Sequence, residues 1–186
     1  MKVALVVGHK PTSPGAMNTA LGITEYGFNN ALANDISMEL DIHGIHCHIV
    51  QRNSYRDLPD EINDEVEPDF IVSLHCNAYK EAPGQKEATG TEVLYYHASR
   101  HGKSMAEIMQ AHLVDALKLR NRGALPRHSE DRGGYLLRYT HAPCIICEPF
   151  FIDNNADIKM ANEHYDDLVT AYVSAIVKIG SEVFDG

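Results

Sequence analysis

Short apolar runs alternate with longer amphipathic segments along the chain. Runs rich in β-branched and aliphatic residues predict strands at 2–7, 45–50, 70–74, 91–97 and 143–148. Apolar residues spaced three and four apart predict helices at 24–42, at 99–119 and from 154 or 155 towards 184, with a shorter helix at 58–66. This alternation favours one α/β domain over 1–186, with a mixed, mostly parallel sheet and helices on both faces.

Turn-prone residues separate these elements. Segments rich in Pro, Gly, Ser, Thr or charged residues predict loops at 10–23, 80–90 and 120–134, and 135–138 is expected to be a short strand. The third loop contains several arginines in an acidic chain. Ordinary solvated charge is one interpretation of this patch; the other is a clamp for a substrate carboxylate, which guanidinium groups bind bidentately.

Three of the predicted strands end on an ionisable residue. The run 3–7 leads into Gly8 and His9, the run 70–74 into His75, and the run 144–147 into Glu148. In an open α/β sheet, ligands bind at the edge formed by the carboxyl ends of the strands. Two histidines and a glutamate at that edge predict a metal-dependent hydrolase.

Composition narrows the class of partner. The chain has 186 residues, of which 44% are hydrophobic and 23% charged, a balance typical of globular proteins. Its 16 basic and 26 acidic residues give a net charge of −10, which disfavours nucleic acid and anionic membranes or wall polymers. No apolar run approaches the roughly 20 residues that span a bilayer, so membrane insertion is not expected. The first residues do not have the pattern of a signal peptide.

The remaining cysteines and histidines predict no second metal site. Cys144 and Cys147 form a C-x-x-C within a predicted strand, where residues three apart point to opposite faces and cannot share an ion. Buried thiols are the simpler interpretation. The histidines at 43, 46 and 48 are expected at the surface, and His112 in the core, because it lies in an apolar helical stripe.

Zinc in a catalytic site takes three protein ligands and leaves one position open, and a His, His, carboxylate set is one known combination. His9, Glu25 and His75 match it if the first helix begins beside the first strand. Spacing alone favours a simpler role for Glu25, since a carboxylate in the first helical turn is stabilised by the helix dipole. Glu148, which precedes an apolar segment, is the candidate general base and acid.

At these residues the chain resembles the zinc-dependent N-acetylmuramoyl-L-alanine amidases of the Amidase_3 family. The resemblance covers nearly the whole chain and depends on several short motifs that occur in the family's order. These are Gly8-His9, Glu25 at the head of a helix, Ser73-Leu74-His75-Cys76-Asn77-Ala78, Asn121-Arg122-Gly123, Leu137-Arg138, and the segment from Pro143 to Asn154.

The resemblance implies a site and a reaction. His9, Glu25 and His75 would bind one Zn²⁺ ion, and Glu148 would be the catalytic base. The substrate would be bacterial peptidoglycan, cut at the amide between the lactyl group of N-acetylmuramic acid and L-alanine. The fold would be a sheet of about six strands with helices on both faces. We also expect substrate contacts from Asn77, Arg127 and Arg132.

Other interpretations remain open at this point. A zinc peptidase or deacylase acting on another amide would use the same groups, and a non-catalytic wall-binding module could keep the fold without turnover. The compact form is similar to phage or prophage endolysins, which are synthesised in the cytoplasm and act on the cell wall or periplasm. A catalytic domain excised from an exported enzyme is the alternative. We expect a monomer.

Overall fold

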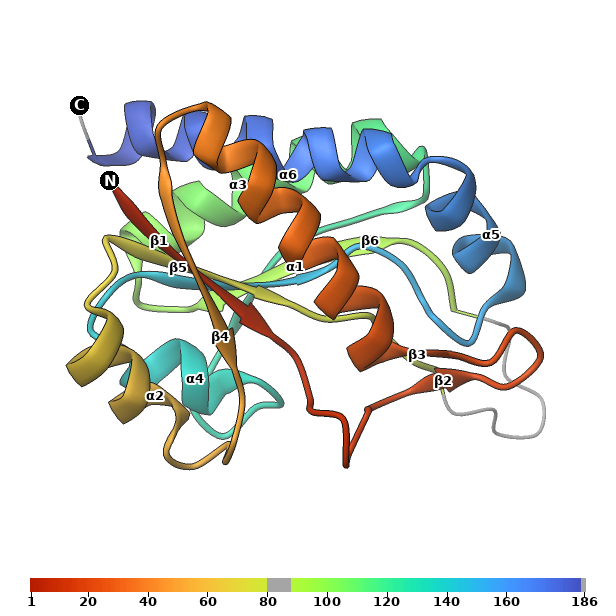
Figure 1. Ribbon diagram of the computed structural model, residues 1–186, viewed down its shortest axis with the longest axis horizontal. Coiled ribbons are helices and arrows are strands. Elements are labelled where there is room, and N and C mark those ends of the chain that lie inside the picture. Colours follow the sequence, from red (N-terminus) through yellow and green to blue (C-terminus); the bar gives the residue numbers. More distant parts are fainter. Residues whose placement is uncertain (80–87, 185–186) are drawn as a thin grey trace.

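The computed structural model describes residues 1–79 and 88–184, which form a six-stranded sheet between two layers of helices (Figure 1). The strand order in this sheet is β4-β1-β5-β8-β6-β7; the pair β6–β8 is antiparallel and the other four neighbouring pairs are parallel. This confirms the predicted mixed, mostly parallel sheet. The strands are β1 (Lys2–Val7), β4 (His46–Gln51), β5 (Phe70–Leu74), β6 (Thr91–Tyr96), β7 (Asn121–Arg127) and β8 (Cys144–Glu148).

The two faces of the sheet are covered unequally. The long helices α1 (Glu25–Ile42), α3 (Arg100–Leu117) and α6 (Tyr165–Ile179) lie together on one face (Figure 1). On the other face lie the short helices α2 (Leu58–Glu61), which continues into a π-helical turn at Ile62–Val66, and α4 (Gly134–Tyr139). A further helix, α5 (Asn155–Glu163), precedes α6, and a π-helical turn at Gly180–Phe184 follows it.

Each strand contributes side chains to two separate cores. Along β1, Val3, Leu5 and Val7 pack under the three long helices, whereas Ala4 and Val6 face α2 and α4. This is the two-residue period of a strand that is buried on both sides. Cys144 and Cys147 are both buried and free, and they fall in opposite cores, as the sequence predicted.

Helix α1 begins where the sequence predicts. Thr24 is its N-cap, and the Thr24 Oγ1 atom accepts a hydrogen bond of 3.1 Å from the Gly27 N–H. The predicted loop before it contains a small hairpin of β2 (Met17–Asn18) and β3 (Ile23–Thr24). Because the hairpin ends at the N-cap, it fixes the position of the first helical residue, Glu25.

Two predictions in the segment after α3 were wrong. Residues 121–127 are an edge strand instead of a loop, and this half-exposed strand has little of the apolar pattern that identifies buried ones. Residues 135–138 belong to helix α4 instead of a strand. In α4 the buried pair Leu136 and Leu137 is too short a run to reveal a helical period.

Smaller differences concern helix continuity and the histidines. The last predicted helix is interrupted at His164, where φ −115° and ψ 32° leave the helical region. His112 is half-buried on α3 instead of lying in the core, whereas the histidines at 43, 46 and 48 are exposed, as predicted. Most of the predicted loop at 80–90 lies outside the described residues. Among the helices of residues 1–79 and 88–184, none has the length and apolar character that crossing a bilayer requires.

Candidate metal centre

Two histidines meet at the carboxyl edge of neighbouring strands. In the parallel pair β1–β5, Val7 is opposite Leu74, and the Gly8 N–H donates a 2.9 Å hydrogen bond to the Leu74 carbonyl. His9 and His75 follow directly, and their ring centroids are 5.4 Å apart. His9 has φ 68°, an uncommon left-handed conformation at the end of β1 that turns the chain out of the sheet.

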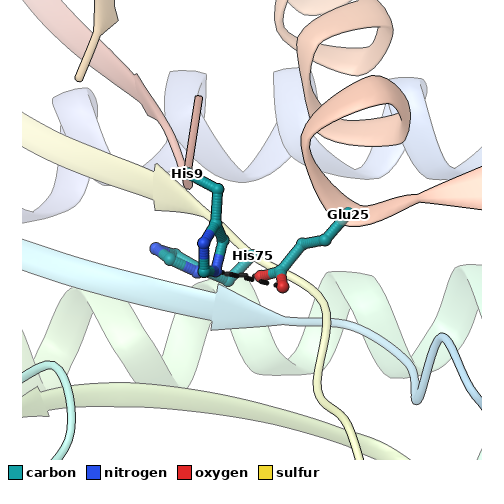
Figure 2. Close-up of side chains that lie close together, drawn as sticks. All are labelled: His9, Glu25 and His75. Carbon is teal, nitrogen blue, oxygen red and sulfur yellow. Dashed lines mark hydrogen bonds and ion pairs between the residues drawn. The ribbon is translucent and has the colours of Figure 1, made fainter. Parts of the chain in front are cut away.

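Glu25 joins the two histidines from the first residue of α1. Its carboxylate is fully buried, with Oε2 3.1 Å from His9 Nε2 and Oε1 3.0 Å from His75 Nδ1 (Figure 2). The backbone N–H groups of Ala16 and Cys76 also donate to it, each at 3.1 Å. The three donor atoms lie within 4.8 Å of one another.

The electrostatics of the cluster keep Glu25 ionised. Burial alone would raise the pKa of this carboxyl group. The hydrogen bond to His75 and the electrostatic attraction of both imidazoles outweigh burial and hold the pKa of Glu25 well below its usual range. Two partly exposed imidazoles therefore face a buried carboxylate that favours its ionised form.

A bound cation would satisfy the three donor atoms better than their contacts with one another do. His9 Nε2 is buried and, within residues 1–79 and 88–184, has no hydrogen-bond partner, although Glu25 Oε2 is 3.1 Å away. An unsatisfied buried nitrogen is costly, and a metal ion placed among the three donors would satisfy it. Two imidazoles and one carboxylate are a donor set that zinc uses in catalytic centres.

Two glycines allow the ligands to approach so closely. A Cβ atom on Gly8 would lie 2.6 Å from His75 Cε1 and 2.6 Å from the Leu74 carbonyl oxygen. A Cβ atom on Gly15, which has φ +80°, would lie 2.6 Å from both Glu25 Oε2 and His9 Cδ2. Any side chain at either position would have to displace a ligand.

Glu148 lies beside this centre at the end of β8. It lines a cavity of about 470 Å³ together with His9 and His75. Glu148 is only 6% exposed. Burial raises the pKa of its carboxyl group, Glu92 adds to the effect, and His75 and Arg132 oppose it. The pKa values of Glu25 and Glu148 are thus shifted in opposite directions by their surroundings.

A family model for N-acetylmuramoyl-L-alanine amidases, Amidase_3, matches residues 3–178. The chain belongs to this amidase family. Helices α1 and α3, nearly all of α6 and of the sheet, and the residues of the metal centre fall inside the matched region.

Individual relatives of the amidase domain agree with this assignment. The uncharacterized protein YqiI of Bacillus subtilis is 31% identical over 101 residues, which cover 52% of this chain and 44% of that protein. The N-acetylmuramoyl-L-alanine amidase LytC of the same organism is 25% identical over 164 residues, 86% of this chain and 31% of LytC. The chain therefore spans less than half the length of these two relatives.

Solved structures show the same fold. A crystal structure of an N-acetylmuramoyl-L-alanine amidase from Clostridium difficile 630 superposes with a TM-score of 0.85 at 22% identity, covering 97% of each chain. AmiC2 of Nostoc punctiforme, another amidase, gives a TM-score of 0.79 at 22% identity and covers 96% of each chain.

Next to Glu148 in this amidase domain lies Glu92, which forms ion pairs with two arginines. The sequence analysis did not predict this cluster. Glu92 lies directly opposite Glu148 in the β6–β8 register and is only 4% exposed. Its carboxylate is 2.5 Å from Arg122 Nε and 3.8 Å from Arg127 Nη2. A lone carboxylate inside the apolar strand 91–97 was the one indication of this role in the sequence.

The three residues expected to contact substrate lie in different surroundings. Arg132 is exposed and lines the same cavity as Glu148, whereas the lining does not include Arg127 or Asn77 within the part of the chain that the structure describes. The Asn77 backbone bonds to Phe150 and Ile152, each at 2.9 Å, and its Oδ1 accepts from the Ala78 N–H. Asn77 therefore ties the segment after His75 to the segment after Glu148.

Substituting Gly15 should weaken metal binding in the amidase domain. In Gly15→Ala the new methyl group meets Glu25 and His9, so we expect zinc affinity to fall about tenfold to a hundredfold, as for other changes that misplace ligands. Gly22→Ala is the matched control, because Gly22 also has positive φ (+67°) but a Cβ atom added there would have nothing within 4 Å. Competition with a zinc chelator measures both affinities, and equal affinities would contradict the proposed crowding.

The buried charge of Glu148 should make stability depend on pH. Its folded-state pKa is raised, so the native protein binds more protons than the unfolded chain between the ordinary and the raised pKa, and stability falls as pH rises through that window. Glutamine cannot ionise, so Glu148→Gln lacks this loss of stability. The free energy of unfolding of the variant minus that of wild type should therefore increase as pH rises. Urea titrations of the two chelator-treated proteins at several pH values measure this difference.

Glu130→Gln provides a control of opposite sign. Hydrogen bonds from its own backbone N–H and from Ser129 lower the pKa of this exposed group. Any pH-dependent difference in the free energy of unfolding between Glu130→Gln and wild type should therefore shift in favour of wild type as pH rises. A difference for Glu148→Gln that does not change with pH would show that Glu148 is not held in an unfavourable charged state.

Proposed function

We propose that the protein is a zinc-dependent N-acetylmuramoyl-L-alanine amidase that hydrolyses the bond between the lactyl group of N-acetylmuramic acid and L-alanine in peptidoglycan. The supporting observation is the convergence of His9, Glu25 and His75, with donor atoms within 4.8 Å of one another, in a chain of the amidase family. Glu148 beside them completes a set of three ligands and one free carboxylate.

In this proposal His9 Nε2, His75 Nδ1 and the Glu25 carboxylate hold one zinc ion. Such an ion supplies Lewis-acid chemistry and lowers the pKa of water to about 7. Glu148 takes a proton from the attacking water on a carboxylate oxygen and delivers it to the nitrogen of the leaving L-alanine. Its raised pKa suits the first step, because a carboxylate buried in this way accepts a proton more readily than an exposed one.

The remaining substrate contacts are also part of the proposal. Arg132, exposed at the cavity, binds a carboxylate of the stem peptide. Arg127 acts less directly, because its guanidinium lies 3.8 Å from Glu92. Asn77 positions substrate through the backbone segment that it joins to the chain after Glu148. We further propose that the protein acts as a monomer on the cell wall, in the manner of a phage-type lysin.

Purified peptidoglycan tests the reaction. The zinc-loaded protein should release L-alanine amino termini in equal number with muramyl lactyl carboxyl groups. A chelator should abolish this release, and added zinc should restore it. New reducing ends would indicate a glycosidase, other new amino termini would indicate a peptidase or deacylase, and binding without any cleavage would indicate a wall-binding module.

Glu148→Gln separates catalysis from binding. We expect turnover to fall roughly a hundredfold to ten-thousandfold, the usual contribution of a general acid–base group, while zinc content and peptidoglycan binding stay at the wild-type level. Glu39→Gln, at an exposed position of α1 outside the cavity lining, is the control and should keep wild-type turnover. Unchanged turnover in Glu148→Gln would remove Glu148 from the mechanism.

A further inference from the structure

Glu92 and Glu148 are buried carboxylates on neighbouring strands. They lie directly opposite each other in the antiparallel pair β6–β8 and are 4% and 6% exposed. Residues at opposite positions of such a pair point to the same face of the sheet with Cβ atoms about 4.5–5.5 Å apart, and like charges there destabilise the sheet. The next residues of β6, Val93 and Leu94, are buried and apolar. A second carboxylate beside Glu148 therefore needs a reason other than packing.

The two carboxylates differ in their partners. Glu92 contacts two guanidinium groups, with Arg122 Nε at 2.5 Å and Arg127 Nη2 at 3.8 Å. Among the residues that the structure describes, Glu92 is the only acidic partner of either arginine. Over the same residues, Glu148 forms no ion pair and accepts no hydrogen bond. The cations near this end of the sheet are therefore paired with Glu92, and the carboxylate of Glu148 is left unpaired.

The side chain of Arg122 extends across β6 towards the end of β8. Arg122 belongs to β7, which pairs with the edge of β6 that faces away from β8. Its guanidinium carbon nevertheless lies 5.0 Å from the centre of the Phe151 ring. Phe151 is buried and follows Glu148 by three residues. The guanidinium group therefore lies beside the chain segment that follows Glu148, and without Glu92 the carboxylate of Glu148 would be its nearest available acidic partner on β8.

We propose that Glu92 is a positioning residue that holds Arg122 away from Glu148 and so keeps the catalytic base unpaired. The inference rests on the proposed amidase function, in which Glu148 takes a proton from the attacking water. A guanidinium group bound to Glu148 would occupy the oxygens that accept this proton and would stabilise their charge, which makes a weaker base. Arg122 is the arginine concerned, because Arg127 is farther from Glu92 and also donates to the Pro126 carbonyl at 3.1 Å.

The contacts of Arg122 favour this internal role over binding of a substrate carboxylate. Arg122 is not part of the cavity lining within residues 1–79 and 88–184. Its charge is already balanced by Glu92, and the Phe151 ring packs against its guanidinium group. A substrate carboxylate would have to displace Glu92 and leave that acid buried without its closest cation, which is costly. The Glu92–Arg122 pair therefore acts inside the protein, next to the base.

Removing the charge of Glu92 should slow the reaction without weakening substrate binding. In Glu92→Met the freed Arg122 pairs with Glu148, so we expect kcat on solubilised peptidoglycan to fall about tenfold to a hundredfold, with KM and zinc content unchanged. Adding Arg122→Met should restore most of the lost turnover, and replacing both members of a buried ion pair by apolar residues is often tolerated. A merely structural role predicts the reverse, because a second buried substitution would lower turnover further.

Control variants and a crystal structure complete the test. Glu107 and Lys103 form an exposed ion pair on α3, with 3.8 Å between Lys103 Nζ and Glu107 Oε1, so Glu107→Met alone and together with Lys103→Met should keep wild-type kcat. The crystal structure of Glu92→Met gives a readout that does not depend on activity. We expect the guanidinium group of Arg122 within about 4 Å of a Glu148 oxygen, the distance of an ion pair. Glu92→Gln, which keeps the side-chain shape, is the second variant if Glu92→Met does not fold.

Three results would overturn the inference. The first is an unchanged kcat when the charge of Glu92 is removed. The second is a double variant that turns over more slowly than the Glu92 variant alone. The third is an Arg122 guanidinium group that stays away from Glu148 in the crystal structure of the Glu92 variant. Failure of the amidase proposal is recognised separately, because wild-type protein would then release no L-alanine amino termini from peptidoglycan, wherever Arg122 lies in the variant.

Discussion

The buried carboxylate of Glu25 is the interaction on which the site depends. Glu25 is the first residue of α1, and its two carboxylate oxygens contact His9 and His75. The same oxygens accept hydrogen bonds from the backbone N–H groups of Ala16, just before the hairpin, and Cys76, just after β5. A buried anion is stable only when surrounded by such partners. The position of α1 against β1 and β5, and with it the larger of the two cores, is therefore coupled to the geometry of the metal centre.

The carboxyl groups of Glu25 and Glu148 have pKa values shifted in opposite directions because their surroundings differ. Glu25 is held ionised by two imidazoles, whereas Glu148 is buried opposite another acid, Glu92, and binds its proton more tightly than usual. The antiparallel pairing of β6 with β8 creates the second environment. A fully parallel sheet would not pair these two acids in this register.

The sequence was sufficient to predict the location of residues that directly follow or end a strand. His9, His75 and Glu148 end apolar runs, and parallel strands bring such ends to one edge. Spacing could not predict whether Glu25 joins the two histidines, because that depends on how close the start of α1 lies to the end of β1. The edge strand at 121–127 and helix α4 were missed because short, half-exposed elements have no clear apolar period. The cavity between α2 and α4 depends on those placements, so it was beyond prediction as well.

Anomalous diffraction at the zinc edge, recorded on crystals of the zinc-loaded protein, tests the central claim most directly. The account predicts one strong peak within bonding distance, about 2.0–2.2 Å, of His9 Nε2, His75 Nδ1 and a Glu25 carboxylate oxygen, with Glu148 close by but not bound. A peak elsewhere, or His9 and His75 without a shared ion in zinc-loaded crystals, would contradict it.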